Sequence, residues 1–209
     1  IPNVISNLDN SYIYLQGPPG TGKTTQAANA IVELIKKNKK VAITANSHKV
    51  IHNLIEKIED TAVQKKIKFK GLKAGRENDV DTVYNGKFVT TSSRDTDFIY
   101  GVKDKTTFLF GGTKYHLSNS YYDSKMDYLF IDEAGQISVA DLIVLGQIAK
   151  NIVLIGDQNQ LGQPTKGSHP GLSGKSILEF LLGDLETIPQ DRGIFLNRTY
   201  RLHPEINEF

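Results

Sequence analysis

The chain has 209 residues, and its 25 lysines and arginines against 23 acidic residues give a net charge of +2. Hydrophobic residues at 39% and charged residues at 23% exclude a disordered or fibrous chain. The absence of cysteine excludes disulfides, thiolate metal sites and a cysteine nucleophile, and it fits a cytoplasmic protein. No apolar run approaches the roughly 18 residues of a membrane span, so we expect no membrane contact. Because the chain starts at Ile1 and contains only Met126, we expect it to be a fragment of a longer protein.

Short apolar runs alternate with stretches of helical periodicity along the chain. The runs expected to form strands are 12–15, 41–44, 88–91, 107–110, 128–131, 152–155 and 194–196. The stretches expected to form helices are 23–37, 49–58, 139–148 and 176–182. This alternation predicts an α/β domain around a largely parallel sheet. Segments 60–86 and 94–125 are the least regular, and we expect them to be insertions.

The segment from Gly17 to Thr24 (GPPGTGKT) matches the phosphate-loop spacing G-x-x-x-x-G-K-[ST] between a predicted strand and a predicted helix. Its glycines let backbone N–H groups surround a phosphate without obstruction by Cβ atoms. The lysine would contact the β- and γ-phosphates, and the final threonine would offer its hydroxyl to Mg²⁺. The predicted nucleotide-binding residues are Gly17, Pro18, Pro19, Gly20, Thr21, Gly22, Lys23, Thr24 and Thr25. A second GKS string at 174–176 lacks the upstream glycine and strand, so we expect a helix cap there.

Two carboxylates follow the apolar run that ends at Ile131. Ligands of open α/β sheets collect at the carboxyl ends of strands, so both side chains should face the phosphates. Asp132 suits Mg²⁺, and Glu133 suits the orientation and deprotonation of an attacking water. After the next predicted strand, the amide of Gln160 could contact the γ-phosphate or that water.

In this order the motifs resemble those of the first RecA-like motor domain of superfamily 1 helicases, in the 5′-to-3′ branch that includes the helicase of nonsense-mediated mRNA decay. The segments that carry the resemblance are GPPGTGKTT at 17–25, DEAGQ at 132–136, GDQNQL at 156–161 and LNRTYRLHPEI at 196–206. The third segment departs from the family pattern, which usually continues with two prolines, and Leu202 stands at a methionine position. The resemblance implies a three-layer P-loop NTPase fold over 1–195, the start of a second RecA-like domain over 196–209, and a catalytic role for Arg201 beside those of Lys23, Glu133 and Gln160.

Two shorter segments resemble family motifs that contact the backbone of single-stranded nucleic acid. The implied nucleic-acid-binding residues are Ser47, His48, Lys49 and Thr113. A helix cap by Asn46 or Ser47 and an ordinary glycine turn are the alternative interpretations.

A basic segment surrounds the first of these motifs. Between Lys36 and Arg76 there are 12 basic and 3 acidic residues, a local charge of +9. Such a segment can be a solvated helix surface or a phosphate-binding surface. If it is a phosphate-binding surface, Lys49, Lys65, Lys66 and Lys68 would contribute to the binding of single-stranded nucleic acid.

Aromatic and histidine side chains leave further alternatives open. His48 and His52 have the i, i+4 spacing of a zinc helix, but no third ligand accompanies them. The rings of Tyr115, His116, Tyr121 and Tyr122 could stack on bases or pack on the core.

The resemblance implies an ATP-dependent DNA or RNA helicase or translocase that uses ATP and Mg²⁺. Its expected partners are single-stranded nucleic acid and the second RecA-like domain, without which this chain should hydrolyse ATP weakly. The alternatives are a nucleotide-regulated nucleic-acid-binding module without unwinding activity, and a phosphate-loop transferase or kinase. Glu133 and Gln160 favour the hydrolase, because a pure binding module does not need to activate water. The preference for adenine rests on the resemblance alone.

Overall fold

In the computed structural model, which describes residues 1–158 and 170–200, the strands form one sheet. The strands are β1 (Tyr12–Gln16), β2 (Val41–Thr44), β3 (Lys70–Ala74), β4 (Val89–Ser92), β5 (Thr107–Gly111), β6 (Met126–Ile131), β7 (Ala149–Gly156) and β8 (Gly193–Phe195). Their order across the sheet is β4-β3-β5-β2-β6-β7-β1-β8, and every pairing between them is parallel.

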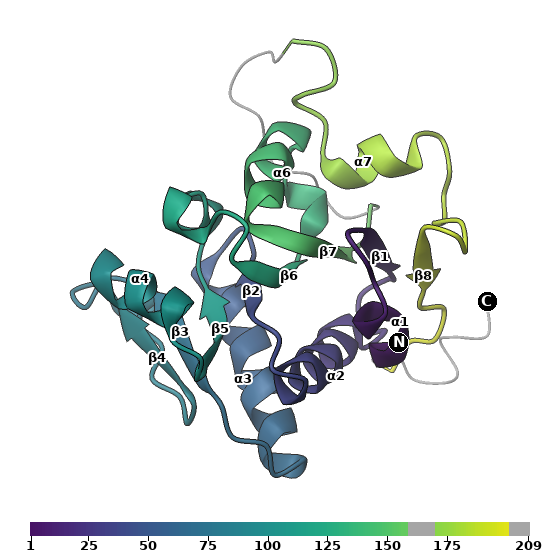
Figure 1. Cartoon of the computed structure of the whole chain (residues 1–209). Coiled ribbons are helices and arrows are strands. Elements are labelled where there is room, and N and C mark those ends of the chain that lie inside the picture. The colour runs from purple at the N-terminus through teal and green to yellow at the C-terminus, as the bar shows by residue number, and fades with distance from the viewer. Residues whose placement is uncertain (159–169, 201–209) are drawn as a thin grey trace.

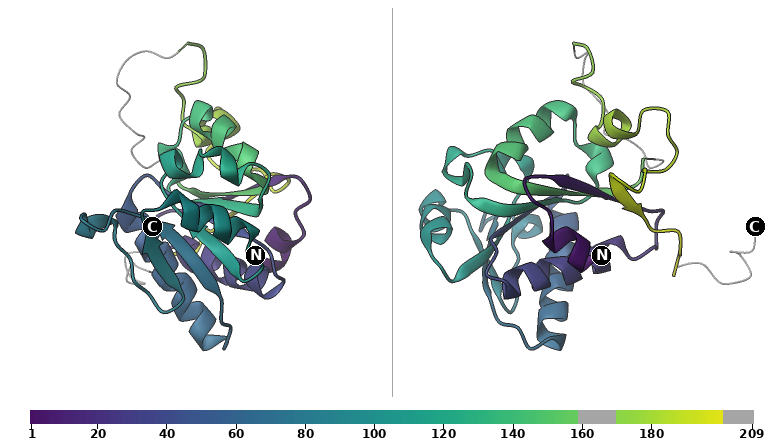
Figure 2. Two further views of the ribbon diagram at one scale, coloured as in Figure 1. Left: turned by 60° about the vertical axis from the view of Figure 1, so that its left-hand side comes forward. Right: turned by 45° about the vertical axis from the view of Figure 1, so that its right-hand side comes forward.

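Helices cover both faces of this sheet (Figures 1 and 2). One face carries α1 (Pro2–Ser6), α2 (Lys23–Lys36) and α3 (His48–Gln64). The other carries α4 (Asp95–Lys103), α5 (Lys114–Leu117), α6 (Val139–Leu145) and α7 (Ile177–Leu182). Short 3₁₀ turns lie at η1 (Val80–Thr82), η2 (Ser120–Tyr122), η3 (Ala134–Gln136) and η4 (Gly146–Ile148). The predicted three-layer α/β architecture is confirmed. Among the described helices, none combines the length and apolar character needed to cross a bilayer.

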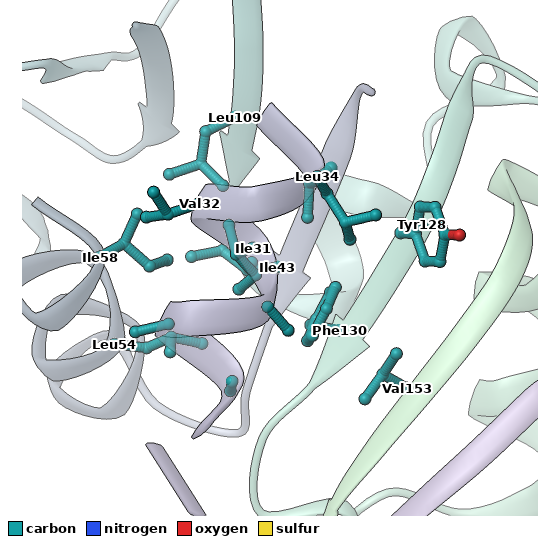
Figure 3. Packing of buried hydrophobic residues seen from close by; sticks show 14 of the residues in the cluster. Ile31, Val32, Leu34, Ile43, Leu54, Ile58, Leu109, Tyr128, Phe130 and Val153 are labelled. Carbon is teal, nitrogen blue, oxygen red and sulfur yellow. The ribbon is translucent and has the colours of Figure 1, made fainter. Parts of the chain in front are cut away.

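The two buried faces explain why the central strands carry apolar residues at successive positions and not only at alternate ones. Successive side chains of a strand point to opposite faces. In β6, Phe130 packs on the side of α2 and α3, whereas Leu129 and Ile131 pack on the side of α4 to α7. In the first of these layers, side chains of α2 and α3 meet those of the sheet (Figure 3). The labelled members of that layer are Ile31, Val32, Leu34, Ile43, Leu54, Ile58, Leu109, Tyr128, Phe130 and Val153.

All the predicted strands are present, but β3 was not expected, and neither were α1, α4 and α5. Strand β3 has the sequence KGLKA, whose lysines and glycine give no apolar run. It forms because β4 and β5 pair with its two sides and supply the hydrogen bonds that its composition would not predict. Segments 60–86 and 94–125 are therefore more regular than expected, since beside the predicted β5 they contain β3, α4 and α5.

Glu59 of α3 joins this helix to the edge of the sheet. Its side chain is 7% exposed, and its carboxylate accepts hydrogen bonds from the backbone N–H groups of Lys87 (2.9 Å), Phe88 (2.7 Å) and Val89 (2.8 Å). The hydroxyl of Tyr84 donates a fourth, at 3.1 Å. The carboxylate thus satisfies three backbone donors at the start of the edge strand β4 and fixes that strand against α3.

We expect Glu59→Ala to lower the free energy of unfolding by about 2–4 kcal/mol, because it leaves several buried N–H groups without an acceptor. Urea unfolding of the domain measures this change. Glu56→Ala is the matched control: Glu56 is exposed on the same helix, and its removal should cost no more than about 0.5 kcal/mol. Equal stability of the two variants would contradict the role given to Glu59.

Candidate functional site

The predicted site residues lie at one edge of the sheet. Because all strands are parallel, their carboxyl ends meet there, where ligands of such folds bind. The order of the strands divides this edge into two parts. The segments after β1, β6 and β7 carry the predicted nucleotide-site residues, and the segments after β2 and β5 carry the predicted nucleic-acid-binding residues. Strands β6 and β2 are neighbours at the boundary between the two parts.

The phosphate loop connects β1 to α2. Gly20 and Gly22 have φ angles of 84° and 81°, in the left-handed region that favours glycine. Gly22 is the N-cap of α2, and as a glycine it supplies no side-chain cap to the first N–H groups of this helix. The Lys23 ammonium donates to the carbonyl oxygens of Pro18, at 2.9 Å, and Gly17. The loop thus combines backbone N–H groups, a helix N-terminus and a cation, which together fit a nucleotide phosphate.

Close packing explains the glycine at position 17. A Cβ atom there would lie 2.6 Å from Oγ1 of Thr21 and 3.0 Å from Cβ of Leu196. The same threonine hydroxyl donates to the carbonyl of Pro18 at 2.9 Å, which closes the loop. Any larger residue at Gly17 would separate the loop from the segment after β8.

A pocket of about 430 Å³ lies between the phosphate loop and the segment after β8. The backbone N–H of Tyr200 donates to the carbonyl of Gly20 at 2.9 Å, and Arg198 lies over the Tyr200 ring at 5.3 Å. The contact is not predictable from the sequence, where 196–209 are expected to start a second domain. In the structure Leu196, Asn197, Arg198 and Tyr200 line the phosphate-loop pocket.

Asp132 and Glu133 follow β6 in different environments. Asp132 is 7% exposed, and its Oδ1 accepts the backbone N–H of Glu133 at 2.9 Å. Burial raises the pKa of Asp132 to about 6, while nearby Lys23 acts in the opposite direction. Glu133 is half-buried, with a positive φ of 53°, and burial raises its pKa as well. Positive φ in a non-glycine residue is a strained conformation that is frequent at functional sites.

The donor set suits Mg²⁺ held together with phosphates. Within 1–158 and 170–200, no three histidine or acidic side chains gather into a metal-binding cluster. Mg²⁺ usually takes one or two carboxylates and completes its shell with phosphate oxygens and water. Asp132 and the hydroxyl of Thr24, in the first turn of α2, are compatible with that arrangement.

The loop after β7 is anchored by amide hydrogen bonds. Gln16 Nε2 donates to Gln158 Oε1 at 2.9 Å, and Gln158 Nε2 donates to the carbonyl of Leu185 at 3.2 Å. These bonds fix the start of the GDQNQL segment. The predicted catalytic residues Gln160 and Arg201 lie outside the described residues.

A second pocket, of about 590 Å³, opens at the ends of β2, β3, β4 and β5. Of the predicted nucleic-acid-binding residues, His48 and Thr113 line it. Ser47 lies outside the lining and caps α3 by accepting the N–H of Val50 at 3.3 Å, and Lys49 is exposed outside the lining. The lining residues that the sequence analysis did not name as nucleic-acid-binding include Arg76, Asp79, Ser92 and Ser93.

A buried lysine sets the protonation of His48. Lys73 of β3 is fully buried, and its Nζ lies 2.9 Å from His48 Nδ1 and also bonds to the carbonyl of Thr82. Burial lowers the pKa of Lys73 to about 8, so the group is still an ammonium at neutral pH. An ammonium only donates, so Nδ1 accepts and the ring hydrogen sits on Nε2. Burial and the Lys73 charge also lower the pKa of His48, which therefore stays neutral and offers one N–H donor.

The aromatic side chains near this pocket divide into packed and exposed rings. Tyr122 is buried, with its hydroxyl 2.8 Å from His116 Nε2, and Tyr121 donates to Asp95 at 3.0 Å. Tyr115 is 78% exposed and lines the pocket. Tyr115 is therefore the ring that is available for stacking on a base.

The basic segment does not form one surface. Lys40 donates to the carbonyls of Gly101 (3.1 Å) and Asp104 (2.8 Å), and Lys65 pairs with Glu33 at 2.8 Å. The 17 residues of α3 separate its two ends by about 25 Å, so Lys65 and its neighbours lie far from the pocket. Lys65, Lys66 and Lys68 therefore do not belong to the pocket lining, and a contact between them and bound nucleic acid stays a prediction.

Comparisons with known proteins agree with this geometry. The family model described as an AAA domain matches residues 4–171. The DNA replication ATP-dependent helicase/nuclease dna2 of Schizosaccharomyces pombe is 27% identical over 201 residues, which cover 94% of this chain and 14% of the relative. The RecBCD enzyme subunit RecD of Buchnera aphidicola is 30% identical over 184 residues, covering 85% and 26%. A regulator of nonsense transcripts 1 homolog of Neurospora crassa is 27% identical over 241 residues, covering 97% and 21%.

This chain thus spans between 14% and 26% of the length of these relatives. They confirm the resemblance to superfamily 1 helicases. Among solved structures, a nuclease-deletion mutant of the Type ISP restriction-modification enzyme LlaGI, in complex with a DNA substrate mimic, matches 93% of this chain and 16% of its own. Its TM-score of 0.51 at 13% identity is a likeness of fold.

The raised pKa of Asp132 means that its ionised carboxylate destabilises the folded state. Between its ordinary pKa of 3.8 and about 6, the folded state holds the proton more tightly than the unfolded state, so stability falls as pH rises through this range. We expect Asp132→Asn to stabilise the domain by up to about 3 kcal/mol near neutral pH, with the gain vanishing below pH ~4. Urea unfolding across this pH range measures the difference. A variant less stable than the parent at neutral pH would contradict the prediction.

Proposed function

Because this chain belongs to the AAA domain family, we propose that it is the first motor domain of an ATP-dependent helicase or translocase that acts on single-stranded nucleic acid. The observation that carries the proposal is the shared carboxyl edge of the sheet. It holds the phosphate loop and the acidic pair beside a pocket lined by two of the predicted nucleic-acid-binding residues. We also propose a cytoplasmic location, which the lack of cysteine favours.

ATP would bind with its phosphates in the loop between β1 and α2. The Lys23 ammonium, which donates to loop carbonyls, would donate to phosphate oxygens when ATP is bound. The N–H groups at the start of α2 would donate to phosphate oxygens in place of solvent. Thr24 and Asp132 would hold Mg²⁺, which when bound neutralises charge on the β- and γ-phosphates.

Glu133 would act as the general base for hydrolysis. A water molecule would attack the γ-phosphorus while its proton passes to the Glu133 carboxylate, and the bond to the β-phosphate oxygen would break to release ADP. The raised pKa of Glu133 makes it a stronger base than an ordinary glutamate. Gln160 and Arg201 are proposed to position the water and to stabilise charge on the γ-phosphate.

Nucleic acid would lie along the pocket at the ends of β2 to β5. His48 offers a neutral N–H donor, and Arg76 offers a cation for backbone phosphates, while Tyr115 can stack on a base. Such contacts do not distinguish DNA from RNA. We therefore propose single-stranded nucleic acid in general as the ligand, with the second RecA-like domain completing the ATP site.

Two substitutions separate nucleotide binding from turnover in the intact protein. We expect Lys23→Ala to abolish tight ATP binding, whereas Glu133→Gln should keep ATP binding and lower turnover by about 10²–10⁴-fold. Fluorescent-nucleotide titration and phosphate release measure the two effects. Lys36→Ala, at the exposed end of α2, is the control and should change neither. Wild-type turnover by Glu133→Gln would contradict the role of Glu133 as general base, whereas an intact parent that binds ATP without turning it over would favour the nucleotide-regulated binding module.

Substitutions in the pocket at the ends of β2 to β5 test the binding of single-stranded nucleic acid. We expect His48→Ala to weaken binding of both poly(dT) and poly(U) by about fivefold, the value of one neutral hydrogen bond, without changing the salt dependence. Arg76→Ala should lower the slope of log affinity against log salt by about one unit, because it removes a charge. Lys66→Ala, at the far end of α3, is the control and should leave affinity and slope unchanged. A loss confined to Lys66→Ala would place the strand elsewhere.

A further inference from the structure

A chain of amide hydrogen bonds links the two parts of the sheet edge. Asn46 Nδ2 donates to Gln136 Oε1 at 2.8 Å, and Gln136 Nε2 donates to Glu133 Oε2 at 3.4 Å. Asn46 follows β2, where α3 begins, and Glu133 and Gln136 follow β6. The link therefore starts beside the nucleic-acid pocket and ends on the proposed general base.

The backbone after β6 places the two side chains of this link together. The N–H of Gln136 bonds to the carbonyl of Glu133 at 2.8 Å, and the residues between them form the 3₁₀ turn η3. In a 3₁₀ turn, side chains three residues apart eclipse each other. The positive φ of Glu133 starts this turn, so the strained residue and its amide partner form one local unit.

The amide of Gln136 affects Glu133 according to its orientation. With Nε2 toward the carboxylate, it donates a hydrogen bond, favours the ionised base and fixes one carboxylate oxygen. The other oxygen, Oε1, then remains for the proton of the attacking water. With the amide turned over, its carbonyl oxygen would face the carboxylate and repel it.

Asn46 fixes the productive orientation. Its NH₂ group meets Oε1 of Gln136, so the opposite end of that amide, Nε2, points to Glu133. Asn46 is itself exposed and immediately precedes Ser47, the N-cap of α3, and His48, which lines the nucleic-acid pocket. Nucleic acid bound at the start of α3 would act directly on Asn46, the residue that orients the Gln136 amide.

We propose that Asn46 and Gln136 are positioning residues that transmit occupancy of the nucleic-acid pocket to Glu133, so that strand binding sets the orientation of the base for ATP hydrolysis. This inference rests on the proposed function. It adds the route by which the two sites communicate, which is direct contact between the neighbouring strands β2 and β6.

The test uses the intact protein and the variants Asn46→Ala and Gln136→Ala, alone and combined. ATP turnover is measured with and without saturating poly(dT) or poly(U), together with the KM for ATP and the affinity for the strand. We expect each single variant to lower the ratio of stimulated to basal kcat by about three- to thirtyfold, with strand affinity little changed. The double variant should resemble Gln136→Ala, because both residues act through one link.

A comparison of kcat with KM separates this role from a structural one. Loss of the Gln136 hydrogen bond should lower stimulated kcat and leave the KM for ATP at the parental value, because the amide contacts the Glu133 carboxylate and not the phosphate loop. Asn53→Ala, exposed on α3, is the matched control and should retain the parental ratio and KM. Thermal unfolding of each variant verifies that it is folded.

The outcomes distinguish this inference from the proposed function. Stimulation that persists in both single variants, or losses that add in the double variant, would overturn the inference while leaving the motor function intact. ATP turnover in the parent that does not respond to any single strand would overturn the proposed function and the inference with it.

Discussion

The parallel direction of the strands is the constraint on which the rest of this domain depends. A parallel pair cannot be closed by a tight turn, so each connection crosses the sheet, mostly through a helix, and both faces become buried. The same geometry brings every strand to its carboxyl end at one edge. Residues far apart in sequence, such as Lys23 and Glu133, or His48 and Thr113, belong to one surface because the backbone hydrogen bonds of the sheet place them there.

Burial of both faces made most strands predictable from sequence, because it demands apolar residues at every position. Strand β3 shows the limit of this signal. Lys73 lies in it and is fully buried, yet a lysine in a short run containing glycine resembles a loop. The lysine is tolerated because His48 and the carbonyl of Thr82 accept its hydrogen bonds, and neither partner is recognisable from local sequence.

The candidate site was predictable where chemistry fixes the spacing of residues and unpredictable where packing does. The phosphate loop follows from its glycines and lysine, and the acidic pair follows from its place after an apolar run. The contact between Asn46 and Gln136 joins residues 90 positions apart, and it exists only because β2 and β6 are neighbours. Likewise, a serine at position 47 suits both a phosphate contact and a helix cap; the structure shows the cap, through the N–H of Val50, and the phosphate contact stays a prediction.

The fixation of α3 has a mechanical consequence. This helix begins at the pocket proposed to bind nucleic acid, while Glu59, two-thirds of the way along it, is bonded to three successive N–H groups at the start of β4. Single-stranded nucleic acid moving past the pocket would exert a force on the N-terminal end of α3. The Glu59 carboxylate would transmit that force to the sheet. Under the proposed function, the stiffness of α3 would convert a pull on the nucleic acid into a displacement of the whole domain instead of a local bend.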